Sequence, residues 1–248
     1  MKNVLLLALL MWAFVGCRET ERPLTVFLAG DSTVADKPYR EGNPEKGWGQ
    51  VFPLYFKDGV RVVNHAVNGR STKSFIDEGR WTALLSEVAA GDYVFIEFGH
   101  NDSKVESEER YAAADGAYSD NLRRFVADVR ALDATPVLLT PIVRRRFDEQ
   151  GRFYDTHEAY PGAVRKVAGE LDVLLIDLHK STEELLIRFG PETSKNLFLH
   201  IDINEYQHLQ KPIVDDTHLS AYGAFKVADM VAAELKVSLA ELAAYLKE

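Results

Sequence analysis

The stretch that decides the fold is Leu24-Thr25-Val26-Phe27-Leu28-Ala29, which runs directly into Gly30-Asp31-Ser32-Thr33. The first six residues form a nearly continuous apolar run, which is typical of a β-strand buried on both faces. Ser32 therefore stands at the end of a buried strand, with its side chain free at the edge of a sheet. A serine in this place can act as a nucleophile, or it can cap the helix that follows.

Four further β-rich runs, most of them nearly continuous and apolar, alternate with helical patterns. Strands are predicted over residues 24–29, 60–64, 93–98, 136–140 and 173–177. Helices are predicted over residues 48–56, 74–90, 118–132 and 160–171, around 181–189, and over 221–246 with an interruption near 237–238. This alternation predicts a single α/β domain in which about five parallel strands lie between two layers of helices. Ligands of such sheets bind at the carboxyl ends of the strands.

Length and composition agree with one globular domain. The chain has 248 residues, of which 46% are hydrophobic and 27% are charged, so it can build one sizeable core. Its net charge of −9 argues against a nucleic-acid partner, because phosphate binding needs a basic surface. Three longer loops are predicted over residues 35–47, 144–156 and 196–212, and loops of this length are often functional.

The N-terminus has the features of an export signal. Met1 and Lys2 give a short positive start, and residues 4–15 form an apolar run that is too short to span a bilayer but suits a signal peptide. Gly16 and Cys17 close this run in a pattern that resembles a bacterial lipobox. We therefore expect Cys17 to be lipidated; the alternative is an ordinary secretory signal with a chance cysteine.

These features divide the chain into three parts. We expect a signal peptide over residues 1–17, a short tether over 18–23 and a folded domain over 24–248. The protein would then be exported and held in the bacterial cell envelope, periplasmic or on the surface, with the lipid as its one contact with the membrane. Without lipidation it would be secreted. Cys17 is the only cysteine, so no intramolecular disulfide can form.

The candidate base for Ser32 is His218, which lies just before the last predicted helix. Asp215 precedes it by three residues, and in a turn such a carboxylate can accept a hydrogen bond from one ring nitrogen while the other acts as base. Asp216 is a competing partner, and a helix-capping role for these residues is the alternative. A second acid–histidine pair, Asp177 and His179, also lies at a predicted strand end.

Attack on an ester needs donors that hold the oxyanion. Gly69 and Asn101 follow the second and third predicted strands, so they would meet Ser32 at one edge of the sheet. Either residue alone can also be read as an ordinary turn residue. After the fourth strand come Arg144 and Arg145, with Arg146, which could meet an anionic substrate or form an exposed basic loop.

Metal ligation is not predicted. No zinc-protease helix motif, paired-cysteine motif or phosphate loop occurs in the sequence. The remaining histidines are scattered, and we interpret most of them as loop or cleft residues rather than metal ligands: His65, His100, His157, His200 and His208.

Taken together, Gly30-Asp31-Ser32-Thr33, Gly69, Asn101 and the Asp215/His218 pair resemble the SGNH (GDSL-type) hydrolases. Finer motifs resemble the rhamnogalacturonan acetylesterase branch: Gly47-Trp48-Gly49-Gln50, Asn68-Gly69-Arg70-Ser71, Phe98-Gly99-His100-Asn101-Asp102, Thr140-Pro141-Ile142-Val143-Arg144-Arg145 and Asp215-Asp216-Thr217-His218-Leu219-Ser220. The resemblance covers nearly all of residues 24–248. Thr33 departs from the leucine of the family motif.

The resemblance implies a flavodoxin-like three-layer fold and an acyl-enzyme mechanism without a cofactor. It assigns Ser32 as nucleophile, His218 as general base and acid, and Asp215 as the acid that orients His218. The oxyanion hole would consist of Ser32, Gly69 and Asn101, and Trp48, Arg144 and Arg145 are expected to contact the substrate.

The function that the resemblance implies is removal of O-acetyl groups from a plant cell-wall polysaccharide, and we expect that polysaccharide to be pectic. The acetylated polysaccharide or oligosaccharide would be the partner of the site. A broad-specificity acylesterase or lysophospholipase of the same superfamily is the first alternative. A glycan-binding lipoprotein with an idle site is the second.

Overall fold

The computed structural model describes residues 22–39, 43–206 and 209–247. Cys17 and the expected signal peptide lie outside these residues. No helix in the described part of the chain is long and apolar enough to cross a membrane.

The centre of the molecule is a parallel sheet of five strands with the order β2-β1-β3-β4-β5. The strands are β1 (Leu24–Gly30), β2 (Val60–Asn64), β3 (Tyr93–Glu97), β4 (Thr135–Leu139) and β5 (Leu174–Ile176). Each predicted strand is present, with bounds within one residue of the prediction. The order changes direction at β1, which is the pattern of a flavodoxin-like sheet and places its ligand site beside the end of β1.

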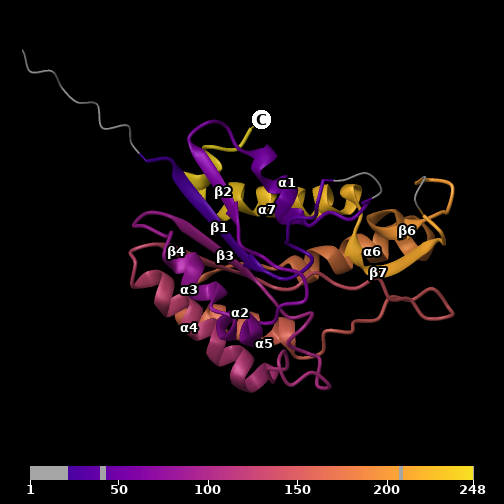
Figure 1. The fold of residues 1–248 in the computed structure, drawn as a ribbon, viewed down its shortest axis with the longest axis horizontal. Coiled ribbons are helices and arrows are strands. Elements are labelled where there is room, and N and C mark those ends of the chain that lie inside the picture. Colours follow the sequence, from indigo (N-terminus) through magenta and orange to yellow (C-terminus); the bar gives the residue numbers. More distant parts are fainter. Residues whose placement is uncertain (1–21, 40–42, 207–208, 248) are drawn as a thin grey trace, which may run out of the picture.

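Helices cover both faces of this sheet and complete three layers (Figure 1). They are α1 (Trp48–Val51), α2 (Thr72–Asp77), α3 (Arg80–Leu85), α4 (Ser119–Arg130), α5 (Tyr160–Leu171), α6 (Leu178–Thr193), α7 (Ala221–Ser238) and α8 (Ala240–Ala243). Shorter helical turns are η1 (Phe52–Tyr55), η2 (Ala114–Tyr118) and η3 (Ser194–Leu197).

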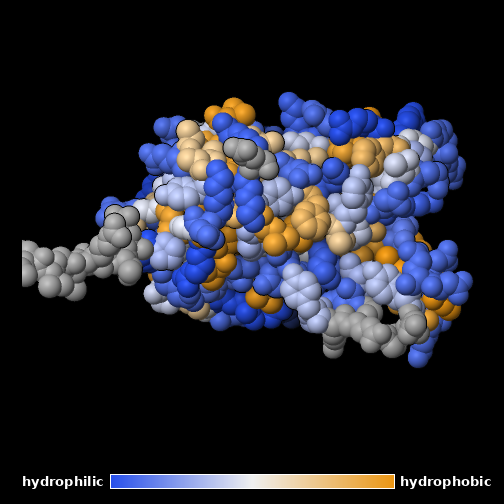
Figure 2. Space-filling model, turned by 90° about the horizontal axis from the view of Figure 1, so that it is seen from above, coloured by the Kyte–Doolittle hydropathy of each residue, from blue (hydrophilic) through white to orange (hydrophobic). Residues whose placement is uncertain are grey.

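Alternate residues of β1 supply the two halves of the core. Val26 and Leu28 pack with α1, α6 and α7, whereas Phe27 and Ala29 pack with α2 to α5. Side chains alternate along a strand, so an unbroken apolar run fills both layers at once. Hydrophilic residues predominate on the face shown in Figure 2, with small apolar patches between them.

Two predicted elements differ from the structure. The single helix expected over residues 74–90 is two short helices, α2 and α3, because Gly79 has a left-handed backbone (φ +71°) and breaks the helix. The loop expected over residues 196–212 contains β6 (Phe198–Ile201), which pairs with β7 (Ile213–Leu219) as a separate antiparallel hairpin.

The β6–β7 hairpin lies beyond the carboxyl ends of the main strands (Figure 1). Its pairing is irregular, because Phe198 faces Leu219 while the next residue, Leu199, faces Asp215. Residues 216–218 therefore bulge out of the ladder. Bulges of this kind re-aim side chains next to functional sites.

Candidate active site

The turn that carries Ser32 is fixed by its neighbour Asp31. The Asp31 Oδ1 atom accepts hydrogen bonds from the backbone N–H and the hydroxyl of Thr33, both at 3.0 Å. At Gly30 an added Cβ would lie 2.9 Å from the carbonyl oxygen of Glu97 on β3, so only glycine fits where these strands end. Ser32 is thereby held at the sheet edge with 7% of its surface exposed.

Ser32, His218 and Asp215 form a continuous hydrogen-bonded chain. The His218 Nε2 atom lies 3.1 Å from Ser32 Oγ, and its Nδ1 atom lies 2.7 Å from Asp215 Oδ2. The other oxygen of Asp215 accepts the backbone N–H groups of Thr217 and His218, at 2.7 and 2.9 Å. The bulge of β7 therefore wraps around the Asp215 carboxylate and aims His218 at the serine.

Asp215 and His218 each shift the pKa of the other towards the charged form. The hydrogen bond that His218 Nδ1 donates to Asp215 raises the pKa of His218 above its ordinary value of 6.5. Burial raises the pKa of Asp215, but the hydrogen bonds from His218 and Thr217 outweigh burial and hold it at about 2. Asp215 is thus ionised at neutral pH, and His218 can exchange a proton with Ser32 near neutrality.

The competing pairs do not form in the structure. Asp216 accepts hydrogen bonds from Arg145, Arg146 and His200, and it has no contact with the ring of His218. The Asp177 carboxylate instead accepts hydrogen bonds from Arg165 and Thr140. The Nε2 atom of His179 forms a hydrogen bond of 3.0 Å with Asp155. Of the acids considered from the sequence, Asp215 alone meets His218.

Gly69 and Asn101 lie beside Ser32 in one pocket of about 380 Å³. Gly69 has a left-handed backbone (φ +75°), a conformation that strains other residues, and an added Cβ would meet no atom within 4 Å. Asn101 is buried, and its Nδ2 atom donates to the Arg70 carbonyl at 3.0 Å, which fixes the amide. The pocket is lined by Ser32, Asn68, Gly69, His100, Asn101, Lys104, Arg144, Asp215, Thr217 and His218.

Of the expected substrate-binding residues, only Arg144 reaches this pocket. Trp48 is 1% exposed and packs in the core, and its indole N–H donates to Glu97 Oε2 at 2.5 Å, so it has no surface to offer a substrate. Arg145 is also buried, and it bonds Asp216 and Ser194. The expectation of substrate contact is therefore corrected for Trp48 and Arg145.

Two cations in the pocket wall are not held in salt bridges among the described residues. Arg144 donates to the carbonyl oxygens of Thr156 and His100, and Lys104 stands nearby in the lining. The next two arginines, Arg145 and Arg146, form salt bridges with Asp216, whereas Arg144 and Lys104 form none within the described residues. An anionic group entering the pocket would find both available. Lys104 was not singled out from the sequence, where one lysine among many gave no signal.

Lys37 was also missed from the sequence, although it supports the nucleophile directly. Its ammonium is buried, donates to the Ser32 carbonyl at 2.7 Å and forms a salt bridge with Glu45 at 2.7 Å. It also donates to the side chain of Asn68, the residue before Gly69. One lysine thus ties together the turns that carry Ser32 and Gly69. Its only signal was a place in the long loop 35–47.

The model of the GDSL-like lipase/acylhydrolase family matches residues 28–224 of this chain. The chain belongs to this family. The match begins within β1 and ends at the start of α7. It therefore includes the three hydrogen-bonded residues Ser32, His218 and Asp215. As a GDSL-like acylhydrolase, the protein is a carboxylic ester hydrolase.

Two relatives from Bacillus subtilis (strain 168) resemble this acylhydrolase over most of both chains. The rhamnogalacturonan acetylesterase RhgT is 45% identical and covers 86% of this chain and 89% of its own. The probable rhamnogalacturonan acetylesterase YesY is 34% identical and covers 85% of this chain and 92% of its own. The family resemblance predicted from the motifs is confirmed.

A solved structure shares the fold of this acylhydrolase. The crystal structure of YxiM from Bacillus subtilis superimposes with a TM-score of 0.73, at 26% sequence identity, over 87% of this chain and 57% of the other. The three-layer α/β/α fold predicted from the strand pattern is therefore confirmed.

Proposed function

We propose that this protein removes O-acetyl groups from an acetylated pectic polysaccharide of the rhamnogalacturonan type. The observation that carries the proposal is the chain from Asp215 through His218 to Ser32, which opens on a polar pocket with donors beside the serine. The similarity to RhgT over most of both chains supports the substrate class.

The mechanism follows from the geometry. His218 Nε2 takes the hydroxyl proton while Ser32 Oγ attacks the acetyl carbonyl carbon. The backbone N–H groups of Ser32 and Gly69, with the Asn101 amide, hold the negative oxygen that develops. His218 then gives its proton to the sugar oxygen as the C–O bond breaks, which leaves an acetyl group on Ser32. Water, deprotonated by His218, attacks that group, and His218 returns the proton to Ser32 Oγ as acetate leaves.

Pectic chains carry uronate carboxylates, and the pocket wall offers the matching charge. We propose that Arg144 and Lys104 bind such a carboxylate, because both line the pocket with Ser32. A neutral acetylated glycan such as xylan would leave these cations without a partner. Charge complementarity therefore favours an acidic polysaccharide over a neutral one.

The primary experiment measures acetate release from acetylated rhamnogalacturonan, homogalacturonan and xylan by the wild type and by Ser32→Ala. We expect the pectic substrates to be preferred, and the variant to lose at least about 10³-fold in turnover because the three residues act as a unit. A Ser32→Ala variant that keeps wild-type turnover would refute the mechanism. Equal rates on all three glycans, or a preference for lysophospholipid, would favour a broad acylesterase instead.

A matched pair of variants tests the uronate contact. Arg144→Met should raise KM on a pectic substrate with little change on a neutral acetyl ester. Arg152→Met is the control, since Arg152 lies in the same loop with its side chain 76% exposed and bonds Asp148. An equal effect of the two variants would count against a role for Arg144.

We also propose that the protein is exported and anchored through Cys17. The support is the sequence alone: a positive start, a short apolar run and Cys17 at its end. Mass spectrometry of the N-terminus from a bacterial host should find a diacylglyceryl group on Cys17. A Cys17→Ser variant should be released from membranes, and unchanged membrane association would refute the anchor.

A further inference from the structure

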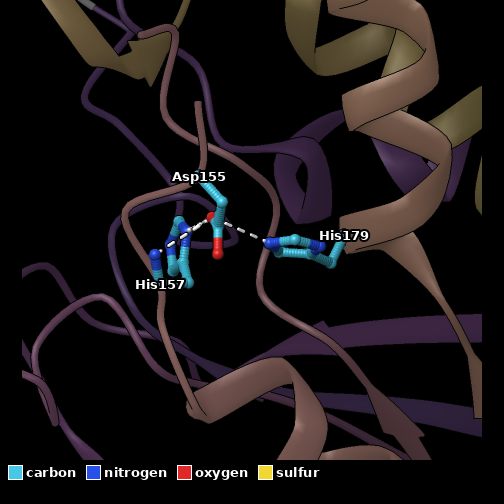
Figure 3. Close-up of side chains that lie close together, drawn as sticks. All are labelled: Asp155, His157 and His179. Carbon is cyan, nitrogen blue, oxygen red and sulfur yellow. Dashed lines mark hydrogen bonds and ion pairs between the residues drawn. The ribbon is translucent and has the colours of Figure 1, made fainter. Parts of the chain in front are cut away.

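Behind the pocket wall, Asp155, His157 and His179 converge from two elements (Figure 3). Asp155 and His157 lie in the loop between β4 and α5, and His179 lies in the first turn of α6. The carboxyl ends of β4 and β5 thus bring one carboxylate and two imidazoles together. None of these residues takes part in the proposed ester hydrolysis.

The donor atoms of this cluster have the spacing of a metal coordination shell. Asp155 Oδ1 lies 3.3 Å from His157 Nδ1 and 3.0 Å from His179 Nε2. One ligand atom from each residue lies within 4.8 Å of the others. With metal–ligand distances of about 2.0–2.2 Å, ligands of a tetrahedral Zn²⁺ ion stand roughly 3.3–3.6 Å apart, so small shifts would let the three residues fill three positions and leave the fourth to water.

The surroundings of the two histidines add independent support. The other ring nitrogen of His157 lies 3.4 Å from His100 Nδ1, and that of His179 lies 4.0 Å from a Glu183 carboxylate oxygen. Metal-binding histidines commonly direct their second ring N–H towards a carboxylate, a carbonyl or water, and Glu183 supplies such a carboxylate beside His179. The two carboxylates, Asp155 and Glu183, would together offset a double positive charge, against the nearby guanidinium of Arg144.

The burial of the cluster and its opening to solvent also fit a metal site. His157 and His179 are buried, whereas the Asp155 side chain is 31% exposed and leaves an entry from solvent. We propose that Asp155, His157 and His179 bind one divalent d-block cation, with Zn²⁺ the best match to two imidazoles and a carboxylate. The ion would fasten the loop after β4, which carries Arg144, to α6.

The proposed ion would also act on the pocket through His100. Without metal, the Nδ1–H group of His157 donates a hydrogen bond to Asp155. His157 Nε2 then accepts a hydrogen bond from the Nδ1–H group of His100, so His100 Nε2 carries a lone pair. A metal on His157 Nδ1 moves the proton of the neutral ring to Nε2, which then donates to His100 Nδ1. The proton of His100 would shift to Nε2, an atom that has no hydrogen-bond partner among the described residues.

The test uses the protein stripped with a chelator and reloaded with Zn²⁺ alone. We expect one equivalent of zinc by elemental analysis, a higher melting temperature with zinc, and visible d–d absorption when Co²⁺ replaces it. His179→Gln should weaken zinc binding by more than about 100-fold, and Glu183→Gln, which removes only a supporting carboxylate, by about 10-fold.

His65→Gln is the matched control, because His65 also faces a carboxylate, that of Glu87 at 3.4 Å, but has no third ligand. The His65→Gln variant should bind zinc like the wild type.

If His179→Gln misfolds, Asp155→Asn at the exposed end of the cluster provides the same test, and esterase activity shows that the chain is folded. Failure of the wild type to bind zinc, or full binding by a folded ligand variant, would overturn the proposal.

Discussion

At the scale of single residues, Asp215 makes His218 a stronger base. Its hydrogen bond raises the pKa of His218, so a larger fraction of the ring is protonated at a given pH near neutrality. The proposed mechanism needs the neutral ring to accept the serine proton. Esterase activity should therefore rise as pH increases through a pKa above 6.5, the ordinary value for histidine.

Asp215→Asn tests this coupling. The variant should lower kcat/KM by about 10³–10⁴-fold, because an amide can hold the wrong tautomer of His218, and the acid limb of its pH profile should move to lower pH. The measurement is kcat/KM against pH on a small acetyl ester. Asp177→Asn, which leaves His218 untouched, is the control; an acid limb that stays in place in Asp215→Asn would contradict the assignment.

Asn101 presents its amide beside the serine, and its removal should affect the chemical step. We expect Asn101→Ala to reduce kcat by about 10²–10³-fold with a smaller change in KM, since the amide stabilises charge that appears only in the transition state. Steady-state kinetics separates the two constants. A variant with higher KM and unchanged kcat would assign Asn101 to substrate binding instead.

At the scale of elements, the main sheet was predictable and the hairpin was not. Most of the five strands are nearly continuous apolar runs, although β2 contains Arg61 and Asn64, and their positions follow from the sequence. β6 has only four residues, too few to stand out as a strand, and β7 contains Asp215, Asp216 and His218, so it shows no apolar run. Their pairing is a long-range contact, which local periodicity cannot reveal.

The same reason explains the misplaced side chains. Trp48 was expected to contact the substrate, but it is buried against Glu97, a partner that lies 49 positions along the chain. Arg144 and Arg145 are adjacent in the sequence, but their side chains point in opposite directions, because side chains alternate along an extended segment. The sequence predicted that an arginine would reach the pocket, and tertiary structure decided which one.

Asp216 joins the hairpin to the loop after β4. It accepts hydrogen bonds from Arg145 and Arg146, at 2.8 and 2.9 Å, and from His200 on β6 at 2.7 Å. Asp216→Asn would leave the buried Arg145 without its counter-charge, so we expect a loss of about 2–4 kcal/mol and a melting temperature lower by about 5–10 °C. Calorimetry measures this.

The control for that variant is Asp148→Asn, which breaks an ion pair to the exposed Arg152. Pairs of that kind contribute about 1 kcal/mol or less. Equal melting temperatures for the two variants would mean that Asp216 does not hold the hairpin in place.

At the scale of the whole molecule, the sheet edge carries three completely buried carboxyl groups. Burial raises the pKa of Asp31, and it raises those of Glu97 and Asp102 to about 8. The folded protein therefore holds these protons more tightly than the unfolded chain, where ordinary values are 3.8 for Asp and 4.5 for Glu. The stability that these three groups contribute is fully present below the ordinary values and is lost as pH rises towards about 8.

Asp102→Asn isolates one of these groups. The amide keeps an oxygen for the two hydrogen bonds from Thr72, and it cannot ionise. The variant should lose less stability than the wild type between pH 5 and about 9, as measured by denaturant unfolding at several pH values. Asp120→Asn, at a side chain that is 75% exposed, should follow the wild type. A slope unchanged in Asp102→Asn would show that Asp102 is already ionised.

The separation of the hairpin from the main sheet has a kinetic consequence. Ser32 follows the central strand β1, whereas Asp215 and His218 belong to a two-stranded ladder of their own. Small ladders open more often than a five-stranded core, so amide hydrogens in β6 and β7 should exchange with solvent faster than those in β1 and β3. Every opening separates base from nucleophile while the core stays folded. The measured turnover is then the intrinsic rate multiplied by the closed fraction, and on warming, catalysis declines before the molecule melts.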